Sequence, residues 1–268
     1  MKRKYDLALG FGPACSCTQT LRRAGLQFLS FPFDWISPIP GESTWGLDVK
    51  RRTDLICTEF KDWLDEGDFV FHGPHTNGMD KYVNTRLQYL FLHDFPQGVP
   101  LAESFPSIAA KYDRRCSRLL ELLRHVRTVL IVRLDRPDLR HHRTPIDDCR
   151  YAISRLSGKF PNARFDFLLL QPDETVPFEK RKVEDLGGGL TRIAFDYQDR
   201  TPGNEPFPLF KLTVAAVSQL FAVKDYRTRE EIADWKRKSR AKHYAKLGAT
   251  NFLQYRLLKI KKALFGKA

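Results

Sequence analysis

The chain has 268 residues, 42% of them hydrophobic and 29% charged, and carries a formal net charge of +13. It is long enough to bury a sizeable core, and no stretch approaches the roughly 20 apolar residues of a membrane-spanning helix. Five cysteines, an odd number spread thinly along the sequence, argue against a disulfide scaffold, so we expect a cytoplasmic protein.

Apolar residues recur in a pattern that predicts strands alternating with helices, which indicates an α/β protein with a central sheet. The first apolar run is short and is interrupted by Asp6, so it predicts a strand rather than a signal peptide. We expect strands at 4–10, 69–72, 87–94, 128–134 and 163–170, and two short strands on either side of 187–189. We expect helices from Cys15 or Ser16 onward and at 43–64, 104–126, 145–158 and 206–223.

The positive charge is concentrated in the last part of the chain. From Lys224 onward there are 14 Lys and Arg but only 4 Asp and Glu. We therefore expect a domain over 1–223 and a basic helical tail over 224–268. The stretch 251–265 has the composition of an amphipathic helix on an anionic membrane surface, which would place the protein peripherally at the inner membrane. Packing on this protein or on a partner is the alternative.

Cys15 differs from the other cysteines because it stands at a predicted helix start. There the backbone N–H groups and the positive end of the helix dipole favour a thiolate and lower the thiol pKa. Cys17 lies two residues further and points away, and Cys116 falls on an apolar helix face. The sequence has no Cys-x-x-Cys pair, so the pattern does not favour structural zinc. Cys15 is the candidate nucleophile, and buried structural sulfur is the alternative.

A nucleophilic cysteine needs a base, and His93 is the candidate among the seven histidines. It ends an apolar strand, where a base would be held rigidly, whereas His141 and His142 stand in an Arg-rich segment. The competing interpretation of His93 is a structural histidine with satisfied hydrogen bonds.

Two motifs resemble those of an uncharacterised bacterial family of papain-like cysteine peptidases. The first consists of Leu9-Gly10, Cys15, Leu21, Gly25-Leu26 and Ser30-x-Pro32-Phe33-Asp34-Trp35. The second is Phe91-Leu-His-Asp-Phe95, followed by Tyr112, Arg114, Arg115 and an apolar strand that contains Arg133. The resemblance covers about residues 5–135, and the spacing from Gly10 to Cys15 is longer here than in the family.

The resemblance implies a Cys-then-His mechanism on a papain-like α/β scaffold. Cys15 would form an acyl-enzyme, while His93 would take its proton and return it to the leaving group. A third group should orient His93, and Asp34 is the expected one, with Asp135 as the alternative. A carboxylate that caps its own loop is the competing interpretation of Asp34.

The substrate expected from this resemblance is a peptide, an amide or an acyl-glycan, and the family is associated with bacterial cell-surface polysaccharide synthesis. No cofactor is implied, because Gly10-x-Gly12 lacks a third glycine and Gly187–Gly189 lacks the Lys-Ser/Thr of a phosphate loop. Nucleic acid is not favoured, since the charge is confined to the tail and no nucleic-acid motif appears. The alternative function is a non-catalytic binding or scaffolding module that docks through its basic tail.

Overall fold

The computed structural model describes residues 2–13, 15–39, 48–135, 143–177, 180–196 and 209–225, with a few isolated positions beyond them. The chain divides into two units, Met1–Lys224 and Asp225–Ala268. The helices predicted in the tail, and the membrane surface expected of them, lie outside the described residues. Among the helices in the described ranges, none is long and apolar enough to cross a membrane.

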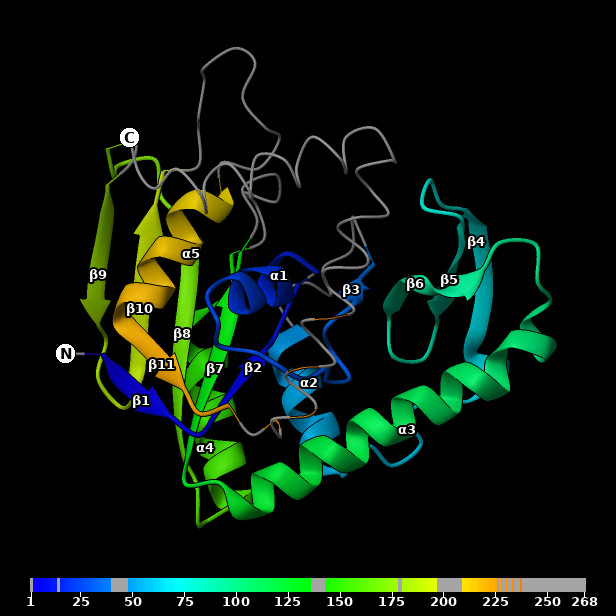
Figure 1. Cartoon of the computed structure of the whole chain (residues 1–268), viewed down its shortest axis with the longest axis horizontal. Helices are drawn as coiled ribbons and strands as arrows, with labels where there is room; N and C mark the ends of the chain where they lie inside the picture. The colour runs from blue at the N-terminus through cyan, green and yellow to red at the C-terminus, as the bar shows by residue number, and fades with distance from the viewer. Residues whose placement is uncertain are drawn as a thin grey trace, which may run out of the picture. The chain divides into compact units, whose positions relative to one another are not determined.

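The centre of the first unit is a five-stranded sheet in the order β2-β7-β8-β10-β9 (Figure 1). The strands β2 (Leu7–Gly10), β7 (Thr128–Leu134), β8 (Arg164–Pro172) and β10 (Leu190–Phe195) run parallel. At the edge, β9 (Arg181–Asp185) pairs antiparallel with β10.

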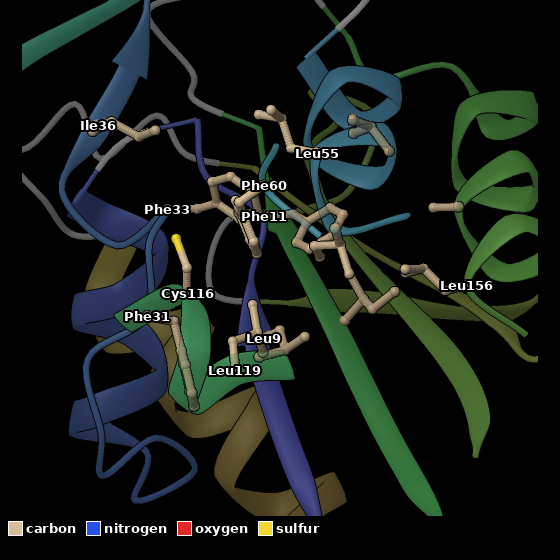
Figure 2. Close-up of a cluster of buried hydrophobic side chains, with 14 of the residues drawn as sticks. Leu9, Phe11, Phe31, Phe33, Ile36, Leu55, Phe60, Cys116, Leu119 and Leu156 are labelled. Atoms are coloured by element: carbon tan, nitrogen blue, oxygen red, sulfur yellow. The ribbon is translucent and has the colours of Figure 1, made fainter. Parts of the chain in front are cut away.

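Helices cover both faces of this sheet, which explains why its central strands contain continuous apolar runs such as 129–132 and 167–170. Cys17 and Leu21 of α1 (Cys15–Arg23) pack with α5 (Leu209–Leu220) against one face. The other face packs on α2 (Asp48–Cys57), α3 (Leu101–His125) and α4 (Ile146–Lys159). Figure 2 shows part of this second core. The expected α/β class, with a central sheet flanked by helices, is confirmed.

A second, antiparallel sheet has the order β3-β6-β5-β4 and shares the aromatic core of α3. Its strands are β3 (Ile36–Pro38), β4 (Phe69–Pro74), β5 (Met79–Asn84) and β6 (Tyr89–Pro96). The sequence predicts β4 and β6 but not β5, because the buried alternate residues of β5 are Asp80, Tyr82 and Asn84, two of which are polar. The short β3 was also missed, since its Ser-Pro ending favours a loop.

Two predicted elements are divided in the structure. The strand expected over 4–10 breaks at Asp6 into β1 (Arg3–Tyr5) and β2, because the Asp6 carboxylate accepts hydrogen bonds from the backbone of Arg127 and Thr128. The helix expected over 206–223 ends at Leu220, and β11 (Phe221–Val223) pairs in parallel with β1. Such pairing between segments far apart in the sequence leaves no local signal.

The helix expected over 43–64 is shorter than predicted. Within the described residues α2 ends at Cys57, and Glu59, Phe60 and Asp62 have positive φ angles of 55°, 59° and 54°. Phe60 and Trp63 are nevertheless buried. Their apolar spacing therefore reflects a turn folded onto the core, followed by a short 3-10 helix, η2 (Glu66–Asp68).

Candidate functional site

Cys15 lies at the carboxyl end of the parallel strands. The chain leaves β2 at Gly10, and Cys15 is the first residue of α1, so the predicted helix start is confirmed. Cys15 is partly buried. The carboxyl ends of parallel strands are where open α/β sheets bind their ligands. Cys15 thus lies both at a helix N-terminus and at the carboxyl edge of the parallel strands.

Cys17 is a structural thiol. It is fully buried, and its Sγ donates a hydrogen bond of 3.2 Å to the Val132 carbonyl oxygen. Burial raises the pKa of the Cys17 thiol to about 12. Burial also raises the thiol pKa of Cys57, Cys116 and Cys149. These four thiols are protonated at neutral pH.

Asp34 is fully buried and caps its own loop. Its carboxylate accepts hydrogen bonds from Gln27 Nε2 at 2.8 Å, from the Phe31 backbone N–H at 2.8 Å and from Thr18 Oγ1 at 3.2 Å. Burial raises its pKa even though these donors oppose the shift. His93 is not among the partners of Asp34, so the structure does not bring this expected pair together.

His93 lies in β6 and is oriented by a different residue, Asn77. Asn77 Nδ2 lies 3.1 Å from His93 Nδ1. The Asn77 amide is fixed at both ends, because Oδ1 accepts the Met79 N–H and Nδ2 donates to the Leu92 carbonyl oxygen. The group that faces His93 Nδ1 is therefore a donor, and Nδ1 accepts. The proton of the neutral imidazole is placed on Nε2.

The surroundings of His93 favour its neutral form. Burial lowers the pKa of His93, with a further lowering from His75 and an opposing effect of Asp94. Its ring also packs against Trp35, with centroids 5.7 Å apart. In this arrangement His93 offers an Nε2–H donor.

Replacing Asn77 by Asp is expected to raise the pKa of His93 by about one unit, since a carboxylate beside Nδ1 favours the imidazolium. The Asn77→Ala variant removes the donor without adding charge, so its rise should be smaller. A pH titration of the histidine ring resonances by NMR, with His93→Gln for assignment, measures both shifts. An unchanged His93 pKa in Asn77→Asp would contradict the contact between the two side chains.

Asp135 belongs to a buried polar network rather than to His93. It follows β7, and its carboxylate accepts from the Thr144 N–H at 2.8 Å, from Thr144 Oγ1 at 2.6 Å and from Gln171 Nε2 at 2.9 Å. Arg133 Nε lies 3.3 Å from its Oδ1. Gln171 Oε1 in turn accepts from Arg192 Nε at 2.9 Å. The network therefore crosses from β7 to β10 at the carboxyl ends of the strands.

The same network contains a buried ion cluster of Asp48, Arg52 and Arg133. All three side chains are at most 1% exposed. Asp48 accepts from Arg52 Nε at 2.8 Å and forms a short ion pair with Arg133 Nη1, which also donates to the Phe11 carbonyl oxygen at 2.7 Å. Asp48 and Arg52 are not among the site residues predicted from the sequence. The feature that could have identified them is an acidic and a basic residue four positions apart in the first turns of α2.

No metal-binding group of three or more His, Cys, Asp or Glu side chains occurs within the described part of the chain. Searches against family models, curated proteins and solved structures found no match to this chain. The functional assignment therefore rests on the residues and their geometry.

Proposed function

We propose that the chain is a cysteine-dependent hydrolase or acyltransferase of papain-like type, with Cys15 as the nucleophile and a peptide, amide or acyl-glycan as substrate. The observation that supports this is the position of Cys15 as the first residue of α1, directly after the carboxyl end of β2. The other four thiols are held protonated by burial.

The proposed reaction runs through an acyl-enzyme. The Cys15 thiolate attacks the substrate carbonyl carbon, a C–S bond forms, and the bond from that carbon to the leaving group breaks as the leaving group takes a proton from solvent water. Water or a sugar hydroxyl then attacks the thioester and gives up its proton to solvent, the C–S bond breaks, and the acyl group is transferred as the thiolate is released. Backbone N–H groups in the first turn of α1 would stabilise the developing oxyanion.

The tautomer of His93 limits its part in this reaction. An Nε2–H group donates a hydrogen bond to a carbonyl oxygen but does not take a proton from Cys15. For His93 to act as the base, the proton must move to Nδ1, and Asn77 must give up its bonds to Leu92 and Met79. We therefore expect the helix terminus, rather than His93, to generate the Cys15 thiolate.

Alkylation by iodoacetamide, followed site by site with mass spectrometry between pH 5 and 10, tests the proposal. Cys15 is expected to react fastest, with a midpoint below the ordinary thiol pKa of about 8.5. Cys57, also partly buried but with a raised pKa, is the internal control. The His93→Ala change should alter the Cys15 rate by less than about threefold, since the base is not needed to form the thiolate.

A Cys15 profile that coincides with that of Cys57 would remove the nucleophile from the proposal. The non-catalytic binding module would then be the better assignment. A large slowing by His93→Ala would instead restore His93 as the base and contradict the tautomer derived from Asn77.

A further inference from the structure

Several contacts hold the guanidinium group of Arg52 in place but leave one of its nitrogen atoms, Nη2, without a hydrogen-bond partner among the described residues. Nε donates to Asp48 at 2.8 Å and Nη1 to the Phe33 carbonyl oxygen at 3.3 Å. The rings of Phe33 and Tyr89 lie 5.1 and 5.2 Å from Cζ. These rings and hydrogen bonds fix the plane of the guanidinium group. The N–H groups that point outward in this plane stay available to other acceptors.

The remaining nitrogen, Nη2, is buried and has no hydrogen-bond partner among the described residues. A buried charged donor without an acceptor is costly, so such a group calls for a specific partner. Ser16 Oγ, in the first turn of α1, is a second buried polar atom without a partner in the described ranges. Arg52 Nη2 and Ser16 Oγ are thus two buried polar atoms without a hydrogen-bond partner among the described residues.

Arg52 lies beside Gly12, in the turn before the helix that carries Ser16. A Cβ atom at Gly12 would lie 2.7 Å from Arg52 Nη2, 2.9 Å from Cζ and 3.2 Å from Nη1, so the guanidinium group lies against the backbone of the turn that leads into α1. The three residue-to-residue steps from Gly12 to Cys15 span at most about 11 Å. The positive charges of Arg133 and Arg52 also act on the Cys17 thiol, which places Arg52 near the first turn of α1.

We propose that Arg52 Nη2, Ser16 Oγ and the N-terminus of α1 bind an oxyanion group, a carboxylate or a phosphate, beside Cys15. Each part is suited to this: the guanidinium supplies a charge-assisted donor, the serine a hydroxyl, and the helix terminus the positive end of the helix dipole. Binding of the anion does not require that Cys15 is a nucleophile. If the proposed function holds, the acyl substrate of Cys15 would carry an anionic group next to the bond that is cleaved.

Two readouts test the site in the full-length chain. The first is the ratio of Cys15 alkylation by iodoacetate, an anionic reagent, to alkylation by iodoacetamide, a neutral one, at constant ionic strength. We expect this ratio to be higher at Cys15 than at Cys57, and sodium phosphate or acetate to slow both reactions at Cys15. The more effective of the two anions identifies the preferred group, phosphate or carboxylate.

The second readout does not require a reactive Cys15. An anion that binds only the folded chain raises the melting temperature in proportion to ln(1 + [L]/Kd). Arg52→Gln is expected to weaken anion binding about tenfold and Ser16→Ala about threefold. Ser16→Ala removes a hydroxyl without a partner, so it remains informative where Arg52→Gln fails to fold. Ser154→Ala, on the exposed face of α4, is the matched control and should bind as the unmodified chain does.

The outcomes separate the two proposals. A fast Cys15 with no iodoacetate preference, no protection and no anion-dependent melting shift overturns the oxyanion site and leaves the nucleophile standing. A slow Cys15 with a phosphate-dependent melting shift that Ser16→Ala weakens supports the site and overturns the nucleophile. Equal anion effects in Ser16→Ala and Ser154→Ala would also overturn the site.

Discussion

Replacing Asp48 by Asn is expected to lower the free energy of unfolding by about 3–5 kcal/mol, the range for breaking a buried ion pair. Asp48 is the only carboxylate that contacts Arg52 among the described residues, and it also pairs with Arg133. An Asn side chain keeps one oxygen acceptor but removes the negative charge. Asp135 would remain as a carboxylate partner of Arg133, and Arg52 would have no carboxylate partner among the described residues.

The effect of Asp48→Asn depends on pH in a defined direction. Burial opposes ionisation of Asp48, but Arg52 and Arg133 outweigh it and hold the carboxyl pKa below its ordinary value. A depressed pKa contributes stability above the unfolded-state pKa, about 3.9, and this contribution is lost as the pH falls toward the folded-state value. The stability difference between the unmodified chain and Asp48→Asn should therefore be full at pH 7 and narrow below about pH 4.

Urea denaturation at pH 7 and at several lower pH values measures this difference. Asp147→Asn in α4 is the control, because the Asp147 side chain is 90% exposed and its ion pair with Arg150 spans 3.5 Å. We expect it to change stability by less than about 0.5 kcal/mol. A loss of under about 1 kcal/mol in Asp48→Asn would show that the cluster is not the buried ion pair described.

Local patterns predict the parts of the fold that depend on local physics. The apolar run at 128–134 is buried on both faces as a central strand, and α3 follows from its regular apolar stripe. The partner of β1, in contrast, is β11, more than 200 residues away, and no pattern in either segment specifies that pairing. The antiparallel sheet was incomplete in the prediction for the same reason: β5 is recognisable only once β4 and β6 flank it.

In the candidate site, too, the features that depend on local sequence were predicted and those that depend on distant residues were not. The helix start at Cys15 follows from the Gly-Pro turn before it, and the loop-capping interpretation of Asp34 matches its bonds to Gln27 and Phe31. The contact of Asn77 with His93 was not predicted, because the sequence Asn77-Gly78 indicates only a tight turn. Asp48 and Arg52 look like a surface ion pair in sequence. What makes them a buried cluster is the position of α2 against Phe33 and Tyr89, which only the fold supplies.

Gly12→Ala is expected to destabilise the chain by about 2–5 kcal/mol, through two separable effects. Gly12 has a φ angle of +71°, where an L side chain costs about 1–2 kcal/mol. In addition, the new Cβ would lie 2.7 Å from Arg52 Nη2, and the guanidinium has little room to move because Asp48 holds its Nε. Overpacking of this kind adds about 1–3 kcal/mol.

Gly25→Ala separates the two effects, because Gly25 has nearly the same φ angle, +70°, and a Cβ there would meet nothing within 4 Å. It should therefore show the backbone cost alone, about 1–2 kcal/mol by urea denaturation. Since the Gly12→Ala methyl group would displace the guanidinium group that carries Nη2, this variant should also lose the phosphate-dependent rise in melting temperature, which Gly25→Ala should keep. Equal destabilisation by the two variants would mean that Arg52 yields to the methyl group, and that its position beside the turn is not fixed by the cluster.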